Sequence, residues 1–278
     1  MNKADNKLYT DKIDNIVEAI RQRRSVIVAL SGGVDSALVA SLAHRALRNR
    51  SQAVTIDSPL VPTKDLDDAK RIADEIGIKL TILELDELDI PGFMTNPPNR
   101  CYLCKRYRFE RLKSMATEKG FDAVVDGTNV SDLNEFRPGL KAAEELDVYQ
   151  PLMEAGVSKE DTRKMAALMK LPITFKPSNP CLATRIPYGQ TVELLKLKRI
   201  EQAEELVRKL TGTKVLRVRD HGNLARIEFG EGDVAPLPSP ALMRSISQSL
   251  KQLGYTFVTI DLEGYRAGSF DQEFHGKF

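Results

Sequence analysis

A six-residue segment, Ser31-Gly32-Gly33-Val34-Asp35-Ser36, has the residue types that bind an anion together with a metal ion. Its two glycines lack Cβ, so the backbone can adopt positive φ and approach phosphate oxygens closely. Its two serines offer hydroxyl donors, and the carboxylate of Asp35 suits Mg²⁺, which prefers oxygen ligands. The segment is not a Walker A loop or a dinucleotide fingerprint, because Gly-Lys-Ser/Thr and Gly-x-Gly-x-x-Gly are absent.

Three cysteines form the second candidate site. Cys101 and Cys104 are a Cys-x-x-Cys pair, and Cys181 lies in a proline-rich segment. Such a pair suits a redox site, half of a zinc site or part of an iron–sulfur site, and two cysteines that only pack are a fourth interpretation. A structural zinc ion prefers four ligands, and no histidine lies close in sequence to these cysteines. Three thiolates could instead hold three irons of a [4Fe-4S] cluster and leave the fourth iron open to bind sulfide.

The elements around these residues indicate an α/β fold. Apolar runs at 25–30, 53–57, 79–85 and 123–126 predict strands that alternate with helices at 10–23, 34–48, 64–76 and 101–119. This alternation is typical of a parallel sheet with helices on both faces. Ligands of such sheets bind at the carboxyl ends of the strands. The 31–36 segment follows one strand, and four further residues follow two others: Asp57, Gly127, Thr128 and Asn129.

The last third of the chain has a different pattern. A helix from about 194 to 207, strands at 214–219 and 224–229, a helix at 240–253 and a strand at 255–262 predict a small α+β domain. We therefore expect a nucleotide-binding domain over 1–188 and a small domain for substrate binding or oligomerisation over 189–278. Within the first of these domains, Ser158 and Asp161 predict a capping box at the start of a helix that extends to about 170.

Composition narrows the class of partner and the compartment. The chain has 278 residues, a formal net charge of +2 and 29% charged residues, so a nucleic-acid partner is not expected. No apolar run approaches the length needed to span a bilayer, and the N-terminal segment is polar without a signal core. We expect a cytoplasmic protein with no membrane partner. Three cysteines, an odd number, do not suggest a disulfide framework.

The 31–36 segment resembles the pyrophosphate loop, SGGxDS, of enzymes that split ATP into AMP and pyrophosphate. Over its whole length the chain resembles a narrower family, the ATP-dependent sulfur transferases of nickel-pincer nucleotide synthesis (the LarE family). Five segments carry this resemblance: SGGVDS at 31–36, DGTN at 126–129, RPG at 137–139, PCLATRIPYG at 180–189 and LRVRDHGNLARIEF at 216–229.

The resemblance implies a substrate and a reaction. The substrate is a nicotinate mononucleotide with two ring carboxylates, which ATP adenylates and from which sulfur displaces AMP. Two rounds give a dithio product that later takes nickel. One branch of the family uses a single cysteine as a sacrificial sulfur donor, whereas another holds a [4Fe-4S] cluster on three cysteines that accepts external sulfide. Cys101, Cys104 and Cys181 place this sequence in the second branch; without a cluster, Cys181 stands at the sacrificial position. The resemblance also implies a homo-oligomer.

Physical arguments give roles around ATP to residues of these segments. The 31–36 loop is expected to hold the β- and γ-phosphates with Mg²⁺, and we expect Asp35 and Cys181 to be the catalytic residues. Thr128 and Asn129 can reach ribose, phosphate or the activated carbonyl. Asp132 is a weaker metal candidate, and Arg137 is placed near the phosphates, although a surface salt bridge explains it nearly as well.

Charged residues of the last segments are candidates for the substrate phosphate. Arg217 and Arg219 alternate on one strand face, and guanidinium groups bind phosphate with two donors at once. A solvent-exposed face of an edge strand is the other interpretation of this alternation. Arg185 is a similar candidate, and Glu228 on the neighbouring strand can orient these arginines or bind a metal.

Three other functions remain open. A tRNA thiolase has the same loop and often three cysteines, but it binds a polyanion, which the near-neutral charge disfavours. A ligase that uses ammonia, such as an NAD synthetase, leaves the cysteines unexplained. A non-catalytic module that binds ATP and zinc predicts zinc without iron and no release of pyrophosphate.

Overall fold

The computed structural model describes residues 3–134, 137–174, 176–230 and 239–271 of the chain. The chain forms two compact units: the first comprises Met1–Glu87 and Asn99–Asn179, and the second comprises Leu88–Pro98 and Pro180–Phe278. The segment 88–98 joins the second unit because its backbone bonds to residues beyond 188, for example Gly189 N to Asn96 O at 3.0 Å. The compact units therefore do not divide at residue 188, and the assignment of functions to 1–188 and 189–278 stays a prediction.

A four-stranded parallel sheet forms the centre of the first unit, with strand order β3-β2-β1-β4. Because β2 and β3 extend the sheet to one side of β1 and β4 lies on the other, the order reverses between β1 and β4, where ligands of such sheets bind. The elements of this unit are α1 (Lys3–Arg21), β1 (Val26–Ala29), α2 (Val34–Leu47), η1 (Arg48–Arg50), β2 (Ser51–Asp57), α3 (Thr63–Ile76), β3 (Lys79–Glu84), α4 (Arg100–Lys119), β4 (Ala123–Val125), η3 (Val130–Asn134), α5 (Gly139–Glu145), α6 (Pro151–Glu154) and α7 (Lys159–Leu168), and η2 (Glu87–Asp89) follows β3.

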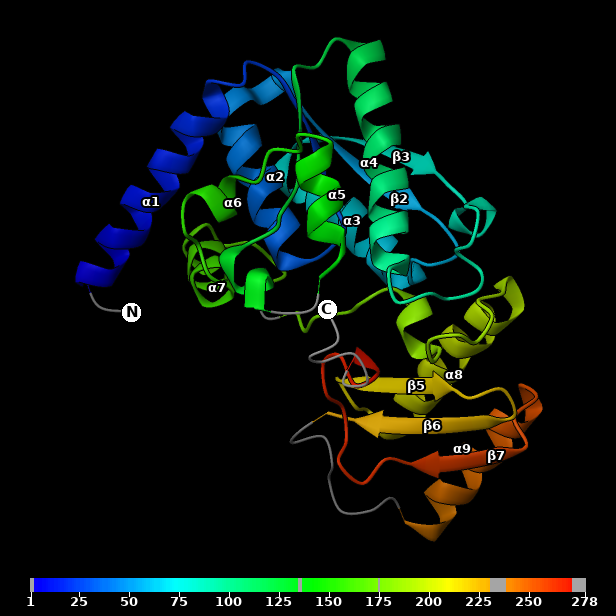
Figure 1. Cartoon of the computed structure of the whole chain (residues 1–278). Coiled ribbons are helices and arrows are strands. Elements are labelled where there is room, and N and C mark those ends of the chain that lie inside the picture. The colour runs from blue at the N-terminus through cyan, green and yellow to red at the C-terminus, as the bar shows by residue number, and fades with distance from the viewer. Residues whose placement is uncertain (1–2, 135–136, 175, 231–238, 272–278) are drawn as a thin grey trace. The chain divides into compact units, whose positions relative to one another are not determined.

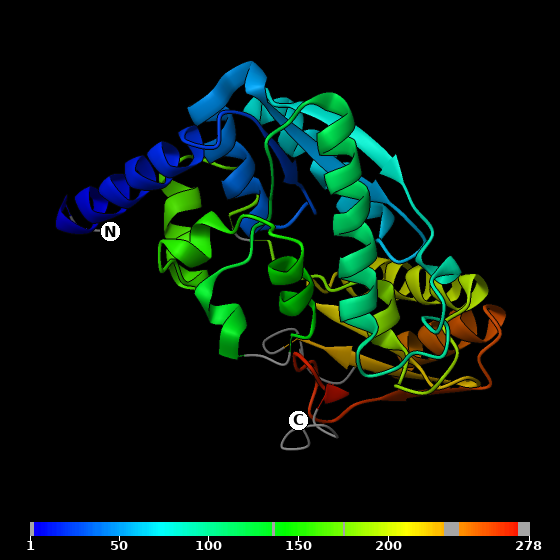
Figure 2. The same cartoon turned by 45° about the horizontal axis from the view of Figure 1, so that its top comes forward.

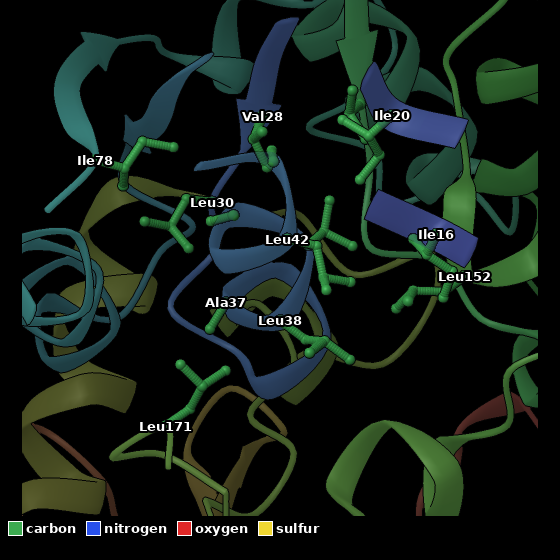
Figure 3. Packing of buried hydrophobic residues seen from close by; sticks show 14 of the residues in the cluster. Ile16, Ile20, Val28, Leu30, Ala37, Leu38, Leu42, Ile78, Leu152 and Leu171 are labelled. Carbon is green, nitrogen blue, oxygen red and sulfur yellow. The ribbon is translucent and has the colours of Figure 1, made fainter. Parts of the chain in front are cut away.

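Alternating side chains of the strands supply two cores, one on each face of this sheet. Val26 and Val28 of β1 pack with α1, α2, α3 and α7, and Figure 3 shows Val28 near residues of that core such as Leu42. Ile27 of β1 points the other way and packs with Phe109 and Leu112 of α4. Figures 1 and 2 show α4 on the opposite side of the sheet from α1 and α2. The expected parallel sheet with helices on both faces is confirmed.

Most predicted elements occur, with shifted ends. The first helix begins at Lys3 rather than near residue 10, because its first turns are largely exposed and carry little apolar periodicity. The helices α5 and α6 have only seven and four residues and were not predicted. The predicted capping box is present: Asp161 N donates to Ser158 Oγ at 3.1 Å, and Ser158 N donates to Asp161 Oδ2 at 3.2 Å.

A three-stranded mixed sheet, with order β5-β6-β7, forms the centre of the second unit. β5 and β6 are antiparallel, and β6 and β7 are parallel. Apolar residues of this sheet, such as Leu216 and Ile227, pack against two helices, so the predicted small α+β domain is confirmed. Its elements are η4 (Leu182–Arg185), α8 (Leu194–Thr211), β5 (Leu216–Asp220), β6 (Leu224–Phe229), α9 (Pro240–Gln252) and β7 (Phe257–Ile260).

Within the part of the chain that the structure describes, no helix is both long and apolar enough to cross a membrane.

Candidate functional site

The 31–36 loop connects β1 to α2 at the carboxyl edge of the first sheet. Gly32 has φ +73°, and a Cβ added there would lie 2.4 Å from the carbonyl oxygen of Asp65 in α3. Two constraints therefore require glycine at this position, because other residues disfavour this φ and because the backbone of α3 leaves no room. The loop keeps its shape through close backbone contact with α3.

The N-terminus of α2 is open to an anion. Its N-cap is Gly33, which has no side chain to accept hydrogen bonds from the N–H groups of the first turn. The hydroxyl of Ser36 braces the loop from inside: it accepts from Ser31 N at 3.1 Å and donates to Gly33 O at 3.1 Å. Ser31 is exposed, and its hydroxyl lies 3.0 Å from that of Ser36. The N–H groups at the start of α2 and the exposed Ser31 are thus available to bind a phosphate.

The segment after β4 meets this loop. A Cβ on Gly127 would lie 2.7 Å from the nitrogen of Ser36, so this glycine allows the two backbones to touch. Asn129 Nδ2 donates to Asp35 Oδ1 at 3.1 Å, and Asn129 N donates to Asp132 Oδ2 at 3.1 Å. The structure thus brings together the predicted residues from the ends of β1 and β4.

Asp35 and Asp132 are the carboxylates of this meeting point. The pKa of Asp35 is raised, first because the group is buried and second because Asp132 lies near it. A cation between them would favour the charged form of both. Among the described residues, no three His, Cys, Asp or Glu side chains gather into a metal site. Mg²⁺ commonly uses one or two carboxylates plus phosphate oxygens and water, so a pair of carboxylates beside a phosphate site fits that ion.

Thr128 is turned toward an internal carboxylate. Its hydroxyl donates to Asp126 Oδ2 at 2.7 Å, and Lys105 Nζ of α4 donates to the same oxygen at 3.0 Å. Burial alone would raise the pKa of the Asp126 carboxyl, but Lys105, Thr128 and the N–H of Gly127 together hold it below its usual value. Sequence analysis missed Lys105, which directly follows Cys104. The DGTN segment was the available signal, because its aspartate, once buried, needs a cation as a partner.

Asp57 and Arg137 are two further residues that the sequence analysis predicts to bind ATP. Asp57 is exposed at the end of β2, where its carbonyl oxygen accepts from Leu85 N at 3.0 Å. Arg137 is 41% exposed and forms an ion pair with Asp132 at 3.0 Å. Roles of Asp57 and Arg137 toward ATP stay predictions.

The three cysteines are reduced and half-buried. Cys101 and Cys104 lie three residues apart near the start of α4, so they share one helix face. Cys181 is the N-cap of η4 and belongs to the second unit. The pair suits two ligands of one metal or cluster, whereas a site that includes the third cysteine stays a prediction.

Arg185 is completely buried in the second unit and holds the Cys181 segment. Its Nε donates to Glu204 Oε1 at 2.9 Å, and its Nη1 donates to the carbonyl oxygens of Pro180 and Cys181, the latter at 3.0 Å. Burial would raise the pKa of Glu204, but Arg185 holds it below its usual value. Arg185 therefore has an internal role, and its role as a ligand of the substrate phosphate stays a prediction.

The two arginines of β5 are buried, which excludes a solvent-exposed face of an edge strand. Arg219 donates to Glu228 Oε2 through Nε at 2.9 Å and Nη2 at 2.7 Å, as expected for an orienting carboxylate. Arg217 lies over the ring of Tyr265 at 4.8 Å. Burial lowers the pKa of Arg217 to about 10, and the nearby charge of Arg185 adds to this effect. Arg217 is thus a buried cation that an anionic ligand would stabilise.

Comparison with known proteins finds similarities that cover part of the chain. A family model described as NAD synthase matches residues 7–96, which contain the 31–36 loop. A glutamine-hydrolysing GMP synthase chain of Methanococcus maripaludis is 30% identical over 175 residues, covering 58% of this chain and 56% of that protein. Both likenesses lie in a part of the chain only.

Some relatives match nearly the whole chain. An uncharacterised protein of Synechocystis is 36% identical over 265 residues, covering 95% of this chain and 98% of that protein. The pyridinium-3,5-bisthiocarboxylic acid mononucleotide synthase of Lactiplantibacillus plantarum is 34% identical over 254 residues, covering 91% of each. The matched length therefore includes both compact units.

Proposed function

We propose that this chain, which belongs to the LarE family of ATP-dependent sulfur transferases, converts ring carboxylates of a dicarboxylated nicotinate mononucleotide into thiocarboxylates. The family follows from relatives above 30% identity that match nearly the whole chain. Membership makes the chain an ATP-using sulfur transferase acting on a precursor of the nickel-pincer cofactor. The sites for the substrate phosphate and for sulfur are proposals.

The observation that carries the proposal is the meeting of Asp35, Asn129 and the 31–36 loop at the carboxyl edge of the sheet. The loop N–H groups and the N-terminus of α2 would hold the β- and γ-phosphates, and Asp35 with Asp132 would hold Mg²⁺. A ring carboxylate oxygen then attacks the α-phosphorus, and the bond to pyrophosphate breaks. The loop donors stabilise the charge that develops on the departing pyrophosphate.

The second unit offers a site for the substrate phosphate. Arg217 and Arg219 are buried on one face of β5, and Glu228 fixes the orientation of Arg219. A buried phosphate would offset the cost of burying Arg217 as a cation. We therefore assign Arg217 and Arg219 to the phosphate of the mononucleotide. Arg185 is the weaker candidate for this phosphate, because it also holds the Cys181 segment.

Cys101, Cys104 and Cys181 are the proposed cysteine ligands of a [4Fe-4S] cluster. When bound, such a cluster supplies an open iron that takes up sulfide. The sulfur nucleophile adds to the adenylated carbon, the C–O bond to AMP breaks and a thiocarboxylate remains. If no cluster is present, the Cys181 thiolate itself would attack the adenylated carbon and expel AMP. Elimination would then break its Cβ–Sγ bond, which leaves a thiocarboxylate on the substrate and a dehydroalanine at position 181.

The test is an anaerobic reaction of the protein with Mg-ATP, sulfide and dicarboxylated nicotinate mononucleotide, followed by mass spectrometry. We expect the substrate to exchange carboxylate oxygen for sulfur, with one AMP and one pyrophosphate released for each exchange. The mass of the intact protein distinguishes the two sulfur sources, because only a sacrificial Cys181 loses its sulfur. Iron and zinc contents, measured on the same sample, identify the metal on the cysteines.

Two controls separate this function from its rivals. Ammonia in place of sulfide should yield no amide product, whereas an ammonia ligase would form one. Replacement of the mononucleotide by tRNA should give no release of AMP, and sulfur incorporation into tRNA would overturn the proposed substrate. Release of AMP when both the mononucleotide and tRNA are absent would show that ATP cleavage is not coupled to a carboxylate.

A further inference from the structure

A carboxylate of α3 joins two residues of the segment that leads to Cys181. Asp65 is 6% exposed; its Oδ1 accepts from Lys176 Nζ at 2.7 Å, and its Oδ2 accepts from Asn179 Nδ2 at 2.8 Å. We call Asp65, Lys176 and Asn179 the Asp65 clamp. All three belong to the first unit, and none was singled out by sequence analysis or needed for the proposed chemistry.

The same clamp contacts the 31–36 loop. Lys176 Nζ also donates to the carbonyl oxygen of Gly32 at 2.8 Å and pairs with Asp68 Oδ2 at 2.6 Å. A cation on this carbonyl polarises the peptide between Gly32 and Gly33, which makes the following N–H a stronger donor to phosphate. A Cβ on Gly32 would lie 2.4 Å from Asp65 O, so the clamp and the loop also touch through their backbones.

Cys181 follows the clamp by two residues. Two extended residues span at most about 7 Å, so a fixed Asn179 limits how far the backbone of Cys181 can move from it. On the other side of Cys181, Arg185 donates to the carbonyl oxygens of Pro180 and Cys181. The cysteine therefore lies between two anchors, of which the first also holds the pyrophosphate loop.

We propose that Asp65, Lys176 and Asn179 are positioning residues that couple the occupied pyrophosphate loop to the Cys181 segment, so that sulfur reaches the adenylate before water. The proposal rests on the proposed function. Attack by sulfur on the adenylated carbon forms a C–S bond, breaks the C–O bond to AMP and gives thiocarboxylate. Attack by water forms a C–O bond instead, expels the same AMP, releases a proton and regenerates the carboxylate. The amount of AMP released per sulfur transferred therefore measures how well ATP cleavage is coupled to sulfur transfer.

The structure suggests a pair of substitutions that tests the hydrogen bond between Asp65 and Asn179. Asn179→Asp places a second carboxylate against Asp65 and removes the hydrogen bond. Asp65→Asn combined with Asn179→Asp restores it with the donor on the other side, while the amide oxygen at position 65 still accepts from Lys176. Asn6→Asp, at an exposed position of α1, makes the same change of charge away from the clamp.

We expect Asn179→Asp to lower sulfur transfer about tenfold or more, because small misplacements of reacting groups cost that much. Release of AMP should stay within about twofold, because Asp65 and Asp68 still hold Lys176 on the carbonyl oxygen of Gly32 and water consumes the adenylate in place of sulfur. The ratio of AMP to sulfur then rises, returns toward one in the double variant and stays at one for Asn6→Asp. A purely structural role would lower both rates together.

Alkylation of Cys181 gives a readout that is independent of sulfur transfer. In wild-type protein without metal on its cysteines, Mg-pyrophosphate should slow the reaction of Cys181 with iodoacetamide about fivefold, at the low end of coupling free energies. The effect should vanish in Asn179→Asp and return in the double variant. If Asn179→Asp does not fold, Asn179→Ala, which deletes the bond without repulsion, takes its place in both assays.

An unchanged ratio of AMP to sulfur together with an unchanged alkylation response in the Asn179 variants would overturn the clamp. If the wild type releases no AMP with the mononucleotide, the proposed function fails, and the alkylation assay alone then decides on the clamp.

Discussion

Glu204→Gln removes one charge from a completely buried ion pair in the second unit. The side chain of Arg185 is 0% exposed and that of Glu204 is 6% exposed, and Glu204 also accepts from Val218 N at 3.2 Å. Removal of one partner of a buried pair leaves an uncompensated charge and costs about 3–5 kcal/mol. Since urea m-values of small proteins lie near 2 kcal/mol/M, the unfolding midpoint of this unit should fall by about 1.5–2.5 M.

The pH dependence of this effect has a definite sign. Arg185 outweighs burial and holds the pKa of Glu204 below its usual value of 4.5. The stabilisation from ionised Glu204 is therefore present above that value and is lost as the pH falls through the lower pKa of the folded state. The stability difference between wild type and Glu204→Gln should be constant near neutral pH and shrink in acid.

The adjacent residue supplies a matched control. Glu205 lies on the same helix, 57% exposed, and pairs with Lys209, so Glu205→Gln should cost less than about 1 kcal/mol. Urea unfolding followed by circular dichroism gives the midpoints. Hydrogen exchange of the peptide that contains β5 and β6 assigns the change to the second unit.

A midpoint of Glu204→Gln equal to that of Glu205→Gln would refute the reasoning, because the buried charge would then cost nothing. A double-mutant cycle with Arg185→Met should give a coupling energy of about 2–3 kcal/mol, and additive losses would mean that the two side chains act independently.

Three further predictions concern the first unit. Gly32→Ala should destabilise by about 1–3 kcal/mol more than Gly120→Ala in thermal unfolding, because both have positive φ but only Gly32 would clash. Equal losses would show that the contact with α3 is unimportant. Ser158→Ala should cost about 1 kcal/mol in urea unfolding, since it deletes the side chain of a capping box, and a neutral effect would contradict this. Asp35→Asn should reduce pyrophosphate release by about 100-fold or more while raising the free energy of unfolding at pH 7. The reason is that burial raises the pKa of Asp35, so its charged form destabilises the folded protein at pH 7. The gain in unfolding free energy should therefore vanish below pH 3.8, the usual pKa of this carboxyl, and a gain that grows in acid would refute the argument.

Local sequence predicted the elements of the first unit because its strands are short apolar runs and its helices have apolar residues at regular spacing. The prediction failed where local periodicity is weak. The first turns of α1 are largely exposed, and α5 and α6 are too short to show a helical repeat. The segment 88–98 joins the second unit through backbone hydrogen bonds, which no pattern in the sequence indicates.

The site was predicted in part. Strand ends identified the 31–36 loop and Asn129, because carboxyl ends of neighbouring parallel strands share one edge. Lys105 and Lys176 were not identified, because nothing in the sequence around a lysine, one of 41 basic residues, indicates that it will pair with a distant aspartate. For Arg185, chemistry alone suggested a phosphate ligand, whereas burial gave its guanidinium internal acceptors.

By itself the sequence determined the glycine loop, the alternation of strands and helices, the capping box and the family, all of which depend on residues close together in the chain or on a pattern matched end to end. Only the tertiary structure decided which charged side chains are buried and with which partners. Asp65 meets Lys176 and Asn179 across more than a hundred residues, at separations of 111 and 114 positions. Burial requires each such charge to have a partner, and the partner is set by packing rather than by neighbours in sequence.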